Sequence, residues 1–384
     1  MVIKVDAGIS TALALDDELM VATEKPPAVQ CIKWTKDERS QTSTELISRM
    51  TWMQSKSMVV EMVYDRAMSL AVWIMADGRA YAVQRLESQA PATEGIRKLF
   101  RGYCFHTPRD EQRVAVKASI NARFSLLAVA CAGAQILVYT ARDYQGNIPI
   151  SHKLEPPASP ITTGDVTALS FSPDGYCLFA GYRHGWALWS VYGKLQGSSF
   201  AALDSLSQAN DEGWLQGIDQ MAWMDSGASI LMMRRGDHRL WLMDLAKSAL
   251  TGCYCSANVA RTVLLANTQL LIYRGYDLPS QTTISADASL WSHVPIPPSY
   301  LHFQRPIRSV VTSSDGRYIA VAGRRGLAHY SVASGRWKQF DDPRSENAFV
   351  VRGGMCWYQH LLIVAAETDD YHEVSGIELT ETIN

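Results

Sequence analysis

A short unit of strand, turn and strand returns about every 50 residues along this chain, and it constrains the fold more than any other feature. The clearest copy runs from Leu178 to Val191, where Arg-His-Gly separates two apolar runs. The other copies turn at these positions: Gly78, Gly133, Asp237, Gly275, Gly326 and, more weakly, Asp369. A single small sheet cannot bury both of its faces, so repeated sheets must stack on their neighbours. The repeat therefore predicts an all-β propeller built from four-stranded blades.

A second signal accompanies two of these copies. Phe171–Gly175 and Thr312–Gly316 each end a predicted strand in Ser-x-Asp-Gly, and Asp-Gly readily adopts the positive φ angles of a tight hairpin. The blade spacing is that of the WD40 and kelch types, although the Trp-Asp dipeptide is absent from the sequence. An ordinary antiparallel sandwich is the alternative, and the regular repeat favours the propeller.

Composition excludes several classes of protein. Hydrophobic residues make up 47% of the chain, enough for a substantial core. The balance of 36 basic and 38 acidic residues gives no basic footprint for nucleic acid. The longest apolar run, Leu126–Tyr139, is interrupted by Gly133 and Gln135 and predicts two strands, not a membrane span. The first residues lack a secretion signal, and seven scattered cysteines suit a cytosolic protein with reduced thiols.

We expect two groups of blades. Residues 1–294 would hold WD40-like blades with loop or helix inserts near 39–57, 93–108 and 197–217. Residues 295–384 would hold further blades, the start of a second propeller, because prolines at 295, 297 and 298 mark a break.

The first two inserts carry helical signals. Thr42 and Glu45 have the spacing of a capping box, which predicts a short helix or a strand-flanking insert. In 93–106, Ile96, Leu99 and Phe100 would share one side of a helical turn, with basic residues outside. Packing against the local core is favoured there over binding to a partner. The third insert is predicted to be a surface loop.

The search for chemistry assigns no catalytic, cofactor-binding or metal-binding residue, and no cofactor. Cys253 and Cys255 are too close in sequence for a zinc knuckle. Three histidines in or beside the turns have no nucleophile or carboxylate partner at a telling spacing, which favours structural roles: His184, His238 and His329.

Two further groups of side chains recur at the turns and strands. Arginines give several turns a positive tip, and solvated charges are favoured over a rim that binds an acidic protein: Arg183, Arg234, Arg235, Arg324 and Arg325. Tryptophans lie on predicted strands, where packing between blades is favoured over a ligand box: Trp186, Trp189, Trp223, Trp241, Trp337 and Trp357.

Three long segments carry a family resemblance: Ser170–Lys194, Pro306–Phe340 and Val350–Ala365. Their ordered strands and turns resemble the large, propeller-bearing subunit of the Ric–Rgp guanine-nucleotide exchange complexes, and the Lys98–Pro108 segment resembles the fungal branch. Members of that family are much longer. The resemblance therefore predicts a fragment, incomplete at both ends, that spans parts of two tandem propellers.

The resemblance implies a regulatory subunit without covalent chemistry. It implies an arrestin-like Rgp partner subunit, a Golgi Rab GTPase as the target, and retrograde endosome-to-Golgi and intra-Golgi transport as the process. It also implies a peripheral location on the cytoplasmic face of Golgi and trans-Golgi network membranes. A trafficking or coat scaffold without exchange activity stays open as an alternative. A propeller hydrolase or sugar-binding protein is disfavoured, because the turns lack clustered carboxylates or a serine with a usable base.

Overall fold

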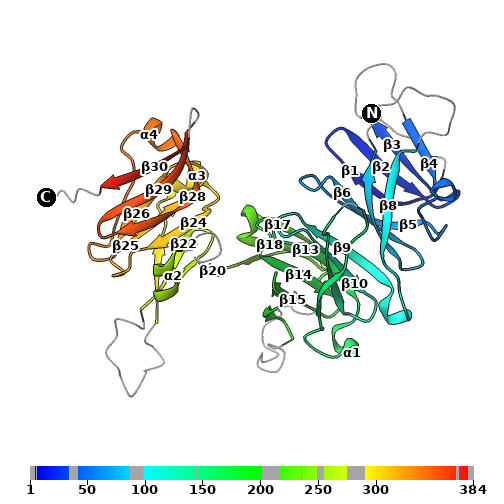
Figure 1. The fold of residues 1–384 in the computed structure, drawn as a ribbon. Coiled ribbons are helices and arrows are strands. Elements are labelled where there is room, and N and C mark those ends of the chain that lie inside the picture. The colour runs from blue at the N-terminus through cyan, green and yellow to red at the C-terminus, as the bar shows by residue number, and fades with distance from the viewer. Residues whose placement is uncertain are drawn as a thin grey trace. The chain divides into compact units, whose positions relative to one another are not determined.

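The computed structural model describes residues 5, 7–33, 42–86, 98–143, 145–200, 217–234, 236–248, 255–274, 290–368 and 372–378. Within these residues the strands form eight antiparallel sheets of three or four strands, and the strands of each sheet pair in chain order (Figure 1). The all-β fold with repeated blades, predicted from the repeat, is confirmed. No helix in the described ranges is long and apolar enough to cross a bilayer.

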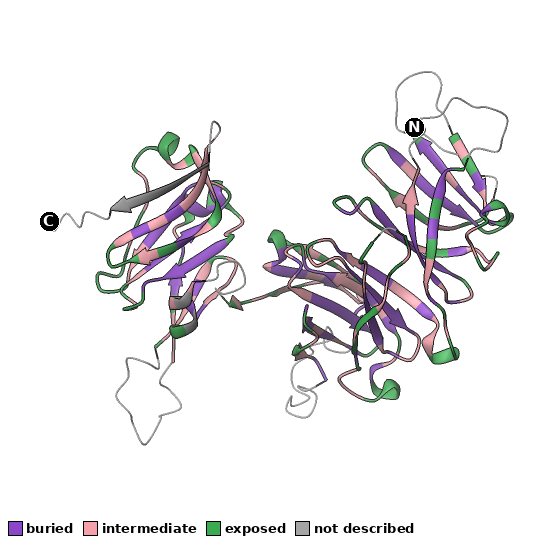
Figure 2. Cartoon of the chain, in the orientation of Figure 1, coloured by how far each residue is buried: buried purple, intermediate pink, exposed green. Residues whose placement is uncertain are grey.

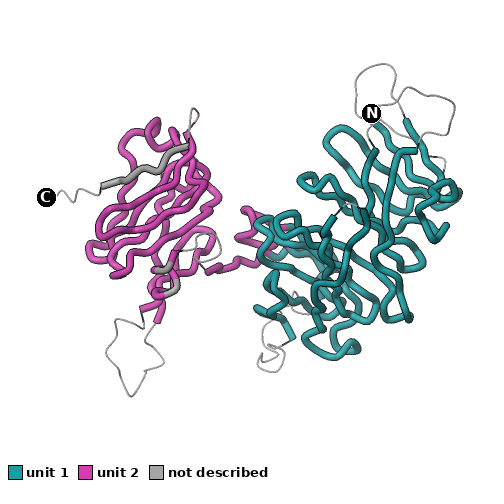
Figure 3. Tube along the Cα trace, in the orientation of Figure 1, with its two compact units in different colours: residues 1–222, 232–241 teal, residues 223–231, 242–384 magenta. Residues whose placement is uncertain are grey.

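The chain divides into two compact units, residues 1–222 with 232–241 and residues 223–231 with 242–384 (Figure 3). Four complete sheets belong to unit 1. The first sheet contains β1 (Ile9–Ala14), β2 (Glu18–Thr23), β3 (Ala28–Lys33) and β4 (Thr42–Leu46). The second contains β5 (Val59–Asp65), β6 (Leu70–Met75), β7 (Ala80–Arg85) and β8 (Phe100–His106). The third sheet contains β9 (Ala115–Asn121), β10 (Leu126–Cys131), β11 (Ile136–Thr140) and β12 (Ile150–Leu154). The fourth contains β13 (Val166–Phe171), β14 (Cys177–Tyr182), β15 (Gly185–Ser190) and β16 (Leu195–Ser198).

The division between the units passes through β17 (Gln220–Met224), β18 (Ser229–Met233) and β19 (Leu240–Asp244). Unit 2 then contains β20 (Lys247–Ser248), β21 (Val263–Leu265), β22 (Gln269–Tyr273) and β23 (Trp291–Pro295). Two further sheets follow, β24 (Ser309–Thr312), β25 (Tyr318–Ala322), β26 (Leu327–Ser331) and β27 (Arg336–Lys338), then β28 (Phe349–Tyr358), β29 (Leu361–Thr368) and β30 (His372–Glu378). Short helices stand in the connections: α1 (Pro160–Thr163), α2 (Ser256–Ala260), α3 (Pro298–Gln304) and α4 (Pro343–Asn347).

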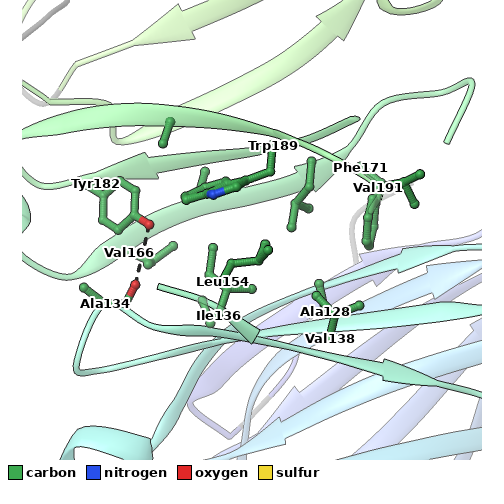
Figure 4. Packing of buried hydrophobic residues seen from close by; sticks show 14 of the residues in the cluster. Ala128, Ala134, Ile136, Val138, Leu154, Val166, Phe171, Tyr182, Trp189 and Val191 are labelled. Carbon is green, nitrogen blue, oxygen red and sulfur yellow. Dashed lines mark hydrogen bonds between the residues drawn. The ribbon is translucent and has the colours of Figure 1, made fainter. Parts of the chain in front are cut away.

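Each hydrophobic cluster of unit 1 draws its side chains from two successive sheets. The first strands β1, β5, β9 and β13 contact one another in turn. In the cluster between the third and fourth sheets, Ile136 and Val138 of β11 face Val166, Tyr182 and Trp189 (Figure 4). The buried stretches accordingly lie inside the stacked sheets (Figure 2). One blade therefore supplies the wall that the next blade needs, as the repeat predicts.

Both Ser-x-Asp-Gly turns form as predicted. The Ser172 hydroxyl donates to Asp174 Oδ1 at 2.5 Å, and the Ser313 hydroxyl donates to Asp315 Oδ1 at 2.6 Å. The following glycines have φ of 77° at Gly175 and 73° at Gly316. A residue with a Cβ would be strained there, so the glycine of each turn is required.

The capping-box residues Thr42 and Glu45 lie in a strand and start no helix there, and Phe100, placed in a helical turn by the sequence pattern, begins another strand. Thr42–Leu46 pairs with β3 along its length, and the Glu45 carboxylate accepts hydrogen bonds from the backbone N–H groups of Leu99 and Phe100 instead of capping a helix. Phe100–His106 pairs with β7. In both places strand pairing and burial outweigh a local helical pattern. Leu99 and Phe100 are buried, which confirms their packing against the local core.

The remaining boundaries are partly covered. In the third insert, Gly197 and Ser198 end β16, and 201–216 lie outside the described residues, as do 39–41 of the first insert and 93–97 of the second. The predicted domain boundary at residue 295 falls at the end of β23, whereas the compact units divide between 222 and 242. A second propeller beginning at residue 295 stays a prediction.

Candidate functional site

A cavity of about 660 Å³ opens between the first two sheets of unit 1. This volume lies within the range of small-molecule sites in proteins. Residues of β2, β3 and β4 form one wall, and residues of β5 to β8 form the other. Its polar side chains include Asp17, Glu18, Lys33 and Arg85, so the charges of these four groups balance.

An ion pair joins the two walls. Glu18 Oε2 on β2 lies 3.0 Å from Arg85 Nη2 on β7, and the Glu18 side chain is only 6% exposed. The Arg85 guanidinium also lies over the Phe100 ring, 5.1 Å from its centre. Because both charges are largely withdrawn from water, removing one partner would leave the other uncompensated, at a cost of about 3 kcal/mol or more.

Two buried donors of this cavity have no hydrogen-bond partner in the described structure. They are Nε1 of Trp73, which is fully buried, and Nη1 of Arg85. Trp73 packs edge-on against the same Phe100 ring at 4.9 Å. These two N–H donors could bind a neutral acceptor in the cavity, such as a carbonyl oxygen or an ordered water. No histidine lines the described walls, so none of their hydroxyl groups has an imidazole base beside it.

A second buried carboxyl lies between the first strands of two blades. Glu61 on β5 is 3.4 Å from the ammonium group of Lys117 on β9, and Glu61 Oε2 has no hydrogen-bond partner among the described groups. Burial raises the pKa of Glu61 to about 7, and the positive charge of Lys117 opposes this rise. The group therefore titrates near neutral pH while holding two blades together.

The three histidines singled out from the sequence lie on different sheets. His184 is in the β14–β15 turn, where its N–H donates to the Thr163 carbonyl, and His238 follows β18. His329 is buried in β26, where burial lowers its pKa to about 4, with a further contribution from Lys338. No cluster of metal-ligating side chains occurs among the described residues. Cys253 lies outside them.

The turn arginines belong to three different sheets. Arg183 pairs with Asp165 at 3.1 Å. Arg234 follows β18, and Arg235 lies outside the described residues. Arg324 and Arg325 occupy the β25–β26 turn, where the Arg325 guanidinium donates to the Asn347 carbonyl.

The tryptophans singled out from the sequence pack in separate places. Trp189 is buried in the core of unit 1. Trp186 stacks on Phe179, and Trp337 and Trp357 pack against the two clusters of unit 2. Trp241 lies under the Arg239 guanidinium, and Trp223 is part of β17. Packing between blades, as predicted, accounts for Trp189, Trp337 and Trp357, whereas Trp186 stacks on a residue of its own sheet.

The sequence gives no hint of a polar junction centred on Gln304, the buried last residue of α3. Its carbonyl oxygen accepts the N–H of Arg324 at 2.7 Å, and its Oε1 accepts that of Arg325 at 2.9 Å. Its Nε2 donates to Glu346 at 2.8 Å and to Asn347 at 3.0 Å. One side chain thus ties the β25–β26 turn to α3 and α4. Its partners are remote in sequence, so no spacing could have revealed it.

Comparison with known proteins finds similarity to one family. Residues 266–376 match the family model of the RIC1 second beta propeller domain. The guanine nucleotide exchange factor subunit ric1 of Schizosaccharomyces pombe is 23% identical over 85% of this chain, and subunit RIC1 of Mus musculus is 26% identical over 64% of it. The chain is related to the Ric1 subunits.

The Ric1-related chain spans 37% of the length of the fission yeast subunit and 21% of that of the mouse subunit. The family resemblance predicted from the sequence is confirmed. The match to the second propeller begins upstream of residue 295 and includes β22 to β29. Among solved structures, the β-propeller domain of Cps50 (Swd1) from Myceliophteria thermophila has a TM-score of 0.41 at 12% identity and covers 94% of each chain.

Proposed function

We propose that this chain is part of a regulatory subunit of a two-subunit guanine-nucleotide exchange factor that activates a Golgi Rab GTPase. The observation that carries the proposal is its relation to Ric1 subunits named as exchange factor subunits. The stacked sheets fit this role, because rigid blades offer a broad surface to partners. The subunit would work without covalent chemistry, on retrograde endosome-to-Golgi and intra-Golgi transport.

The physical task of such a complex is differential binding. Exchange is promoted when the complex binds the nucleotide-free GTPase more tightly than the nucleotide-bound form. This subunit would act with an arrestin-like Rgp partner, on the cytoplasmic face of Golgi and trans-Golgi network membranes. The sheets would hold the partner and the GTPase in one arrangement, and other parts of the complex would displace the nucleotide contacts.

Release of fluorescent GDP from the Golgi Rab tests this proposal. The full-length protein, purified with its Rgp partner, should accelerate release, and deletion of residues 266–376 should remove most of the acceleration. Size-exclusion chromatography of the deleted complex would show whether the partner is still bound. Acceleration by the intact complex is required, and its absence would favour the alternative, a trafficking scaffold without exchange activity.

A further inference from the structure

Three exposed arginines and an exposed phenylalanine lie on neighbouring backbone segments at one end of the sheet β24–β27. This arginine patch consists of Phe303, Arg305, Arg308 and Arg324. The Phe303 side chain is 70% exposed, and the three arginines are exposed as well. Aromatic residues and arginine are both enriched in protein–protein interfaces.

Backbone hydrogen bonds bring the patch together from two segments of chain. The N–H of Arg324 donates to the carbonyl of Gln304, which directly precedes Arg305. The N–H of Arg308 donates to the carbonyl of Ala322 at 2.8 Å. The backbones of the three arginines therefore lie close together. The hydrogen bonds of the buried Gln304 hold these segments in place.

The charges of the patch are not neutralised within the described structure. Arg305, Arg308 and Arg324 form no ion pair with a described residue. The acidic groups nearby are engaged elsewhere, since Glu346 accepts from Gln304 and Asp342 caps α4. Three uncompensated guanidinium groups carried on neighbouring backbone segments create a positive potential that attracts acidic partners.

The aligned turn of unit 1 has the opposite arrangement. Arg183 corresponds to Arg324, yet it is paired with Asp165, and Tyr182, the last residue of β14, stands where unit 2 has Gly323. An exposed arginine at a blade turn is thus neutralised in one unit and left available in the other. This contrast provides a matched control within one chain.

We infer that the arginine patch binds an acidic segment of a partner protein, with an apolar side chain of that segment against Phe303. Guanidinium groups form bidentate bonds with carboxylates, and Phe303 supplies the apolar contact that a purely electrostatic site lacks. The patch lies within the residues that match the RIC1 second propeller. The inference goes beyond the proposed function, because it concerns binding and not nucleotide exchange.

Fluorescence anisotropy tests it with a fluorescein-labelled peptide of alternating glutamate and leucine, and a lysine–leucine peptide as the control. The wild-type chain should bind the acidic peptide, and R305E/R324E should weaken binding about tenfold or more. R183E should leave the affinity within about twofold. Raising the salt from about 50 to 300 mM should weaken wild-type binding.

Two additional variants separate the roles of charge and apolar contact. R305Q/R324Q should lose affinity without introducing repulsion, and F303S should weaken binding at high salt, where screening leaves the apolar contact dominant. Hydrogen exchange at the Arg325 amide would confirm that the Gln304 junction stays formed in each variant. Equal losses in R183E and R305E/R324E would overturn the inference. It would also fail if anionic vesicles bound to the patch and the acidic peptide did not.

Discussion

Two blades of this chain can be aligned residue for residue, from Ser172 against Ser313 to Val191 against Val332. Inside each blade the Ser-x-Asp-Gly turn has the same hydrogen bonds and the same left-handed glycine. What surrounds each blade differs. The comparison teaches that the hairpin is encoded locally, whereas the packing around it is set by whichever element the chain brings alongside.

The buried tyrosines show this most clearly. In unit 1, Tyr182 belongs to β14, and its hydroxyl donates to the Ala134 carbonyl of the preceding sheet. Unit 2 has Gly323 at the aligned position, and its N–H donates to the hydroxyl of Tyr300, which comes from α3. Burial raises the pKa of both tyrosines. A buried tyrosine is thus supplied by the strand in one blade and by a neighbouring helix in the other.

The largest expected effect comes from removing these tyrosines one at a time. Y182A should lower the unfolding free energy of unit 1, and Y300A that of unit 2, by about 3–5 kcal/mol each, because a large buried ring is lost. Hydrogen exchange measured by mass spectrometry would assign each loss to its unit. Y358A, at an exposed tyrosine, should change stability by less than about 0.5 kcal/mol. Equal loosening of both units by either core variant would contradict the separation.

Glu61 in unit 1 and His329 in unit 2 should also link stability to pH with opposite signs. The pKa of Glu61 in unit 1 is raised to about 7. The stability that Glu61 contributes is therefore present at low pH. It is lost as the pH rises from the ordinary pKa of a glutamate through 7, and the loss is roughly 3 kcal/mol at most. The pKa of His329 in unit 2 is lowered to about 4, so its contribution is present above its ordinary pKa and is lost as pH falls toward 4.

Hydrogen exchange of each unit between about pH 4.5 and 7.5 would measure these slopes, after correction for the intrinsic rate. E61Q should remove the Glu61 contribution to the slope of unit 1, and H329Q the His329 contribution to that of unit 2, each leaving the other unit unchanged. A slope in unit 1 that is the same in E61Q and in wild type would contradict the role of Glu61.

A smaller effect is expected at Gly323. A Cβ at this position would lie 2.2 Å from the Gln304 carbonyl oxygen, so G323A must displace backbone and should cost about 1–3 kcal/mol in unit 2. Gly197 in β16 is the control, because a Cβ there meets only Trp186 ring atoms at 4.0 Å. Thermal unfolding should leave G197A within about 0.5 kcal/mol of wild type. A neutral G323A would show that the α3 contact yields.

The smallest effect tests the shared turn. S172A and S313A each remove the hydroxyl that accepts a backbone N–H, from Cys177 in one blade and from Tyr318 in the other. Because the two turns are alike, each variant should cost about 1 kcal/mol. Urea unfolding of the two variants side by side provides the measurement. A large inequality between them would mean that the surroundings, and not the local sequence, determine the stability of the turn.

The same division explains what could be predicted from the sequence. The paired strands around Gly78, Gly133, Gly185 and Gly326 were predictable, since short-range alternation and turn residues determine them. The first sheet was missed because its central turn, between Thr23 and Ala28, lacks the glycine that marked the others.

Long-range features could not be predicted. Glu45 has the spacing of a capping residue, but Leu99 and Phe100 offer it backbone donors from a distant strand. The Glu18–Arg85 pair and the Trp73 indole meet only because two sheets stack. Their contacts depend on tertiary packing, which a single sequence read by periodicity does not contain.

The stability of this end of unit 2 depends on one residue, Gln304. Because one residue serves Arg324, Arg325, Glu346 and Asn347 at once, no partner can leave without weakening the geometry of the others. Thermal fluctuations there should be concerted, with the Arg324 and Arg325 amides becoming exposed to solvent in the same opening event. The β25–β26 turn should therefore keep all of its bonds to Gln304 or lose them together, so the end of the sheet opens as one unit.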